Sequence, residues 1–146
     1  MIKFLSSDTD KELRLSEVWV KHNGITFSGV AMCHPDDEWS EFFGCGLAET
    51  RAMIQAAKYE LRKRREEYKI CLNFVKAIEC YKDFDKFSIS ALKMYRQLNR
   101  KKKEVERAEA RVILLKETIP TQIENREKYK TLIEKIKNSK NKGKEK

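Results

Sequence analysis

The side chains best suited to chemistry in this sequence are arginines spaced to share one face of a helix. Arg107 and Arg111 are four residues apart, so their side chains lie about one helical turn from each other. A planar guanidinium donates several hydrogen bonds in a geometry that fits phosphate oxygens. The cluster Arg62–Arg65 comes level with this pair if the two helical segments fold back on each other. The pattern predicts phosphate binding in the helical part of the chain.

Arg64 differs from these arginines because it occupies a position where the helical repeat calls for an apolar side chain. A cation at such a position lowers stability unless it has a partner or holds an anion. Two interpretations stay open: an ion pair with Glu106, which lies nearly opposite in an antiparallel pairing, and a contribution to a phosphate site.

Most aromatic side chains follow the helical periods and are interpreted as core. Phe84 and Phe87 differ because they fall in a predicted tip, residues 82–87, that joins the two helices. An aromatic ring beside arginines is a common arrangement for stacking a base while its phosphates are held. Phe84 and Phe87 are therefore candidate ligand-binding residues.

Catalytic and metal chemistry have less support. The sequence has no Gly-rich phosphate loop, no HExxH motif and no nucleophile elbow. Its cysteines and histidines lack the spacing of a zinc site, and we expect reduced thiols; they are Cys33, Cys45, Cys71, Cys80, His22 and His34. The acidic run Asp36–Glu38 is interpreted as a helical first turn, with a divalent-metal site as the alternative. We expect a non-enzymatic protein without metal or cofactor.

Two long helices must position the arginines and aromatics. Every seventh residue from Leu47 to Val75, and again from Ala91 to Ile119, is a mostly apolar seam position, which is typical of paired helices. Ser88 is a plausible N-cap for the second helix. Pro120 is expected to interrupt that helix before a weaker helical piece. Residues 137–146, rich in lysine, are expected to be disordered.

The N-terminal third predicts β-structure. Residues 1–11 are polar and are expected to be irregular, whereas apolar and polar residues alternate from Leu13. Asn23-Gly24 predicts a tight hairpin turn, followed by a return strand at 25–32 with Gly29 as a bulge. Pro35 is expected to open a short helix that carries an aromatic knot at Trp39, Phe42 and Phe43. Gly44 to Gly46 are expected to separate this short helix from the long one.

These elements define the predicted fold class and domains. The chain is α+β, with an N-terminal β-hairpin or small antiparallel sheet followed by a long antiparallel helical hairpin that forms oligomers. It is a single domain of residues 1–146: the hairpin and short helix at 1–45, the helical hairpin at 46–136, and the basic tail at 137–146.

Charge is distributed unevenly along the chain. Residues 1–50 hold four Lys and Arg against nine Asp and Glu, a net charge of −5. Since the whole chain has a net charge of +9, residues 51–146 carry +14. This asymmetry favours an anionic partner for the helices, or self-association of unlike faces. No apolar run approaches the roughly 20 residues of a membrane span, and there is no secretory leader pattern, so we expect a cytoplasmic protein.

Two short segments carry a family resemblance. Gly29–Asp37 reads Gly-Val-Ala-Met-Cys-His-Pro-Asp-Asp, and Gly46–Ala52 reads Gly-Leu-Ala-Glu-Thr-Arg-Ala. A hairpin, this Cys/Pro/Asp turn and a Gly/Ala/Arg motif that opens a long helix resemble the Thoeris anti-defence sponge family of phages. The resemblance covers about residues 15–55, and the following helical hairpin in architecture.

The resemblance implies a function without catalysis. Members of the family sequester a cyclic ADP-ribose-type signal, and some hold cyclic nucleotides, between protomers and with arginines and a stacking aromatic. By this resemblance Arg51 matches the motif arginine, and Arg107 and Arg111 match an arginine pair on the second helix. The aromatic stays open among Tyr81, Phe84 and Phe87.

Three hypotheses follow. The first is a phage anti-defence protein that binds and sequesters a cyclic nucleotide immune signal in the host-cell cytoplasm, as a dimer or larger homo-oligomer without a membrane partner. The second is a basic coiled-coil protein that binds nucleic acid, and the third is a structural oligomer. The candidate ligand-binding residues are Arg51, Phe84, Phe87, Arg107 and Arg111. Nucleic-acid binding would weaken steeply with salt and on removal of the lysine tail, whereas a sponge pocket would not.

Overall fold

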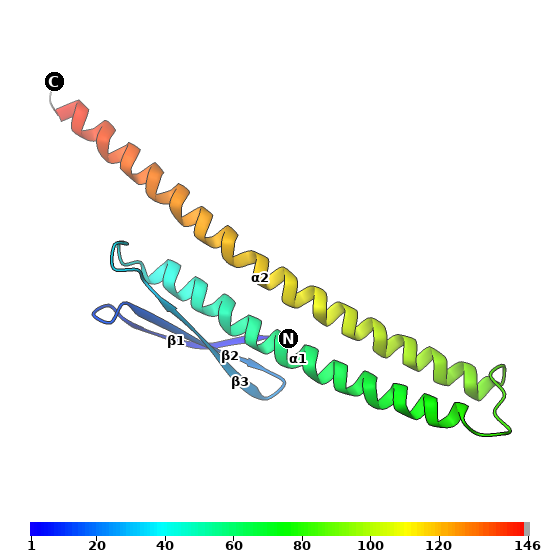
Figure 1. The fold of residues 1–146 in the computed structure, drawn as a ribbon. Helices are drawn as coiled ribbons and strands as arrows, with labels where there is room; N and C mark the ends of the chain where they lie inside the picture. Colours follow the sequence, from blue (N-terminus) through cyan, green and yellow to red (C-terminus); the bar gives the residue numbers. More distant parts are fainter. Residues whose placement is uncertain (145–146) are drawn as a thin grey trace. The chain divides into compact units, whose positions relative to one another are not determined.

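The computed structural model describes residues 1–144 and confirms the α+β class (Figure 1). Three strands come first: β1 (Lys3–Asp10), β2 (Leu15–His22) and β3 (Ile25–Met32). Two long helices follow, α1 (Glu41–Glu79) and α2 (Ile89–Lys144). The chain packs as two compact units. The first is Met1–Met53 together with the chain from Leu115 onward, and the second is Ile54–Leu114.

The sheet is antiparallel in the order β1-β2-β3. Asn23 and Gly24 both have positive φ, 51° and 78°, which confirms the predicted tight turn between β2 and β3. The prediction of an irregular N-terminus was wrong, because β1 pairs with β2 from Lys3 to Asp10 with one irregularity near Phe4. Backbone hydrogen bonds to a neighbouring strand do not depend on polar side chains, so composition concealed this strand.

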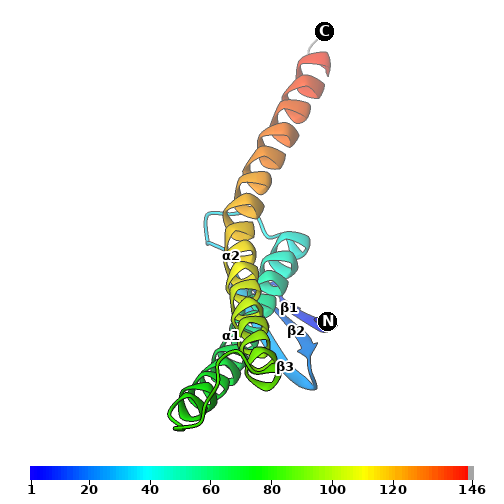
Figure 2. The ribbon, with the colours of Figure 1, turned by 90° about the vertical axis from the view of Figure 1, so that its right-hand side faces the viewer.

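One face of the sheet packs on the first turns of α1, as Figures 1 and 2 show. Its core contains Val18, Val20 and Ala31 from the strands with Ala48 and Ala52 from the helix. The alternation of β2 places Val18 and Val20 on the buried face. Small helical side chains let the helix approach the sheet closely.

Gly29 occupies the point of closest approach. The predicted bulge at this residue was wrong, since β2 and β3 pair in unbroken register and Gly29 lies opposite Val18. A Cβ atom at Gly29 would collide with the backbone of Ala48 and Ala52. The glycine is needed because a helix backbone occupies the space of its missing side chain.

Helix α1 begins at Glu41, before the predicted start of the long helix at residue 46, and ends at Glu79 as expected. Residues 33–40 form a loop, and Ser40 caps the helix by accepting a hydrogen bond from the Phe43 N–H at 3.4 Å. The expected short helix and the break at Gly44–Gly46 were therefore wrong. Gly44 lies against Ser16, where a Cβ would collide with the serine hydroxyl. This glycine serves close packing on the sheet and does not interrupt the helix.

In the second unit, α1 and α2 pair through the predicted seam. Ile54, Ala57 and Val75 of α1 are buried, as are Ala91 and Val112 of α2. The Ser88 hydroxyl accepts a hydrogen bond from the Ala91 N–H at 3.1 Å, which confirms the predicted N-cap of α2. The seven-residue repeat therefore identified the buried stripe correctly.

Helix α2 continues through Pro120 to Lys144. The predicted interruption was wrong, and residues 137–144 are helical where disorder was expected; residues 145–146 lie outside the described chain. Beyond the proline, Gln122, Arg126 and Lys130 follow one another at four-residue intervals, and each bonds to α1 or to the loop before it. These contacts hold the helix after a residue that removes one backbone bond. Neither helix, within residues 1–144, has the length and apolar character of a membrane span.

Candidate functional site

Two adjoining grooves in the first unit share Phe43 and Arg126. The first has a volume of about 660 Å³, and the second about 520 Å³. Both volumes fall in the range of small-molecule sites. The first groove is lined mainly by apolar side chains from β1, β2, α1 and α2, among them Phe4, Val18, Phe42, Phe43, Leu47 and Ile123. The second is lined by aromatic and charged side chains, among them Trp39, Phe43, Arg126, Tyr129, Lys130 and Lys137.

Gln122 supplies a polar group to the first groove. Its Nε2 donates to the Thr50 hydroxyl at 2.8 Å and, more weakly, to the Gly46 carbonyl at 3.4 Å. These bonds orient the amide, and its Oε1 is buried without a hydrogen-bond partner. A buried acceptor without a donor is costly. The amide of Gln122 is therefore held in a fixed orientation beside the first groove.

Arg126 stands over an aromatic ring between the two grooves. Its guanidinium carbon is 5.6 Å from the centre of the Phe43 ring, and the Tyr129 ring centre is 5.9 Å from that of Phe43. A guanidinium at this distance is attracted to the ring face. Its Nη2 also donates to the Glu38 carbonyl at 2.8 Å. The cation is thus held in place while other N–H groups remain for an anion.

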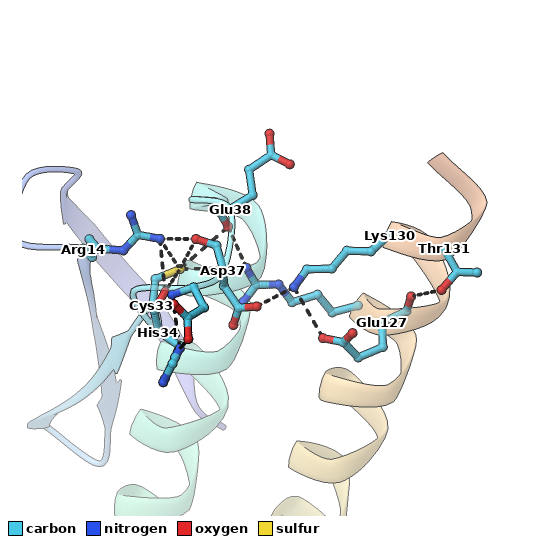
Figure 3. A network of polar contacts seen from close by, with 10 residues as sticks. Arg14, Cys33, His34, Asp37, Glu38, Glu127, Lys130 and Thr131 are labelled. Carbon is cyan, nitrogen blue, oxygen red and sulfur yellow. Dashed lines mark hydrogen bonds and ion pairs between the residues drawn. The ribbon is translucent and has the colours of Figure 1, made fainter. Parts of the chain in front are cut away.

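The loop before α1 is held by a second arginine, as Figure 3 shows. Arg14 has a φ of 57°, and its Nη2 donates to the carbonyls of His34, at 3.1 Å, and Asp37. The same nitrogen lies 3.4 Å from the Cys33 sulfur. The loop carries Trp39 and Glu38, so these contacts fix one wall of the second groove.

An ion pair links this loop to α2. Lys130 Nζ lies 2.7 Å from Asp37 Oδ1. The hydrogen bond from Lys130 lowers the pKa of Asp37 below its ordinary value, and the same bond raises the pKa of Lys130. Both groups therefore stay charged near neutrality. Three carboxylates also line the second groove, Asp36, Glu38 and Glu134, so the groove is mixed in charge and not simply basic.

The residues predicted to bind ligand lie elsewhere. Arg51 belongs to the first unit and donates to the Val30 carbonyl at 2.7 Å. Phe84 packs edge-on against Tyr95, with ring centres 6.4 Å apart, and Phe87 is 75% exposed beneath Lys86. Arg107 and Arg111 are exposed on α2 in the second unit. None of these five predicted residues lines either groove.

Arg64 forms ion pairs, which confirms the first of the two interpretations given for it. Its guanidinium contacts Glu60 at 2.9 Å, Glu67 at 3.2 Å and Glu104 at 3.3 Å. The prediction that Glu106 is its partner was wrong, because the partner on α2 is Glu104. Two residues turn a helix by about 200°, so Glu104 and Glu106 point to different sides of α2. Glu67 also binds Lys101 at 3.3 Å; although burial opposes it, these cations lower the pKa of Glu67.

Sequence reasoning missed Trp39, Phe43, Gln122, Arg126 and Tyr129 as members of one site. The aromatic knot was noticed, but its partners lie beyond Pro120, where the helix was expected to stop. The four-residue spacing of Gln122, Arg126 and Lys130 was the available indication of a shared face. Among the described residues, no group of three or more His, Cys, Asp or Glu side chains is placed to hold a metal ion.

Comparison with known proteins adds no relative from which a function can be carried over. No protein-family model, no curated protein and no solved structure matches this chain. The resemblance of residues 15–55 to the sponge family remains a prediction.

Proposed function

We propose that this protein binds and sequesters a phosphate-bearing nucleotide signal without degrading it. The proposed ligand is of the cyclic ADP-ribose class. We place the protein in phage anti-defence, in which a phage protein sequesters an immune signal made by the bacterial host. The single observation that carries the binding function is the position of Arg126 over Phe43, where an apolar groove meets an aromatic and charged one.

The chemistry of the two grooves suits the two parts of a nucleotide. A base is flat and aromatic, and the rings of Trp39, Phe43 and Tyr129 line the second groove. Phosphates are anions, and Arg126 and Lys137 bring guanidinium and ammonium groups to the same groove. The first groove, where Gln122 stands among apolar side chains, would take the sugar.

Direct binding tests this proposal. Purified protein is titrated calorimetrically with a cyclic ADP-ribose isomer, ADP-ribose and inorganic phosphate, and the ligand is recovered after heating and analysed for intactness. We expect binding of a nucleotide and recovery of an unchanged molecule. A ligand that is recovered cleaved would contradict sequestration, and an absence of nucleotide binding would contradict the proposed function.

A matched pair of variants tests the location of the site. Arg126→Ala removes a cation that lines both grooves, whereas Lys128→Ala removes an equal charge from an exposed residue paired with Glu124. Loss of a charged hydrogen bond costs about 1.5–3 kcal/mol, so Arg126→Ala should weaken binding about 10- to 150-fold and Lys128→Ala should leave it unchanged. Thermal melting shows whether each variant is folded.

The arginine pair predicted from sequence provides the competing location. If Arg107→Ala or Arg111→Ala abolishes nucleotide binding while Arg126→Ala does not, the site lies on the second unit and the groove assignment is wrong. If all three variants bind as the wild type does, arginine does not hold the ligand.

A further inference from the structure

The exposed face of α2 in the second unit carries a row of five cations. The row consists of Arg96, Arg100, Lys103, Arg107 and Arg111. Each follows the previous one by three or four residues, so all five share one face of the helix. All five side chains are exposed, and none has an ion pair or hydrogen bond within the described chain. Two of them, Arg107 and Arg111, are the arginines singled out from the sequence.

Two of the three carboxylates that α2 carries within this unit form ion pairs with cations outside the row. Glu104 binds Arg64 and Lys101 between the helices, and Glu109 binds Arg65 at 2.9 Å. Glu106 is the exposed carboxylate that flanks the row. Residues 54–114 hold 17 Lys and Arg against nine Asp and Glu, a net charge of +8 of the overall +9. The positive charge of the protein is therefore concentrated in this unit.

Like charges one turn apart repel and lower helix stability. The row contains four such successive pairs and no carboxylate within it. A polyanion placed along the row relieves this repulsion and releases its own counterions, which favours binding. Four of the five residues are arginine, the side chain whose donor geometry matches phosphate.

We propose that this row binds the phosphate backbone of a nucleic-acid duplex without reading its sequence. The row extends over 16 residues, about 22 Å along the helix at 1.5 Å per residue, which is long enough to contact several phosphates of a duplex. It contains no aromatic side chain, the platform on which single strands stack, and so it suits a duplex. This activity is separate from nucleotide sequestration and uses a different unit of the chain.

The test compares two triple variants with equal loss of charge. One replaces Arg100, Lys103 and Arg107 by Ala, and the other replaces the exposed α1 residues Lys58, Arg62 and Lys69 by Ala. Binding to a fluorescent duplex of about 30 base pairs is followed by anisotropy between 50 and 200 mM salt. Circular dichroism melting verifies that both variants keep the helical pair.

For five phosphate contacts the dissociation constant of the wild type should rise about 500-fold over this salt range, because each contact adds about 0.9 to the logarithmic salt slope. The α2 variant should show a rise of only about 12-fold, since two contacts remain, and the α1 variant should behave as the wild type does.

Four results would overturn the proposal. Absence of duplex binding at the lowest salt removes it outright. Equal loss in both triple variants shows that net charge alone attracts the duplex. Tighter binding of a single-stranded oligonucleotide than of the duplex rejects the assigned partner. Binding to phosphatidylserine vesicles but not to the duplex, lost in the α2 variant, assigns the row to a membrane surface instead.

Discussion

Replacing Gly29 by Ala tests how closely α1 lies on the sheet. The added Cβ would collide with the Ala48 carbonyl oxygen and the Ala52 backbone nitrogen. Both are backbone atoms of a helix and cannot rotate away, as a side chain would. Strand β3 is equally constrained, because Gly29 is paired in register with Val18 on the central strand. The helix and the sheet must therefore separate to admit one methyl group.

The expected cost follows from two opposing effects. Overpacking a well-packed core costs about 1–3 kcal/mol, and a clash with two backbone atoms belongs near the upper end. Alanine also restricts the unfolded chain, which stabilises by about 0.4–1 kcal/mol where the conformation is compatible. We therefore expect Gly29→Ala to lower the free energy of unfolding by about 2 kcal/mol and the Tm by about 4–8 °C.

Gly46→Ala provides the matched control. Gly46 lies inside α1, and a Cβ there would meet no atom within 4 Å. Alanine is favoured over glycine in a helix by roughly 0.5–1 kcal/mol, so this variant should be more stable than the wild type. Urea unfolding is followed by tryptophan fluorescence, because both tryptophans, Trp19 and Trp39, lie in the first unit. Equal stability of Gly29→Ala and the wild type would refute the close approach of helix and strand.

Three further predictions concern ion pairs and assembly. Arg64→Ala should lower the stability of the helical pair by about 1–2 kcal/mol, as seen by far-UV circular dichroism, with a smaller effect in high salt; an unchanged melting curve would refute it. The pKa of Asp37 is lowered from 3.8, chiefly by the hydrogen bond from Lys130, so its contribution to stability is full above pH 3.8 and is lost as the pH falls through the lowered pKa. The pKa of Lys130 is raised from 10.5, so its contribution is full below pH 10.5 and is lost as the pH rises through the raised value; stability measured against pH should lose both effects in Asp37→Asn. Light scattering at micromolar concentration should show at least a dimer, since exposed apolar residues such as Ile113 need cover, and a monomer would contradict this expectation.

The parts of the fold that sequence predicted are those in which local pattern and burial coincide. The seven-residue repeat locates Val75 and Val112 because a buried stripe must recur once per two turns. Asn23-Gly24 locates the hairpin because few other residues adopt positive φ at both positions of the turn.

The errors share a different origin. Strand β1 is polar, and its place in the sheet depends on the unsatisfied edge of β2, which lies elsewhere in the sequence. Gly29 and Gly44 were interpreted by their flexibility, although their actual role is the lack of a side chain against another element. Pro120 weakens a helix locally, and only contacts made by later residues show that the helix continues.

The candidate site was hidden for the same reason. Arg126 and Glu38, which form one of its hydrogen bonds, are 88 residues apart in the sequence. No local pattern joins Phe43 to Arg126, because their proximity depends on α2 extending past a proline that sequence reasoning treated as its end. For Arg64 the error was smaller. Ion pairing was one of its predicted roles, and only the partner differed, because the rotation of α2 about its axis presents Glu104 and not Glu106.

The bond from Arg51 to Val30 bears on how copies of this protein can assemble. The two-residue turn makes His22 and Ile25 a hydrogen-bonded pair, and alternation along β3 then turns the Val30 carbonyl away from β2, toward the open edge of the sheet. The guanidinium occupies that carbonyl at 2.7 Å. An incoming strand would have to displace a charged group before it could add to this edge, a barrier that discourages uncontrolled fibre-like growth. Arg51 thus blocks the addition of a strand at this edge, and its replacement by a short apolar residue would leave the edge open to aggregation.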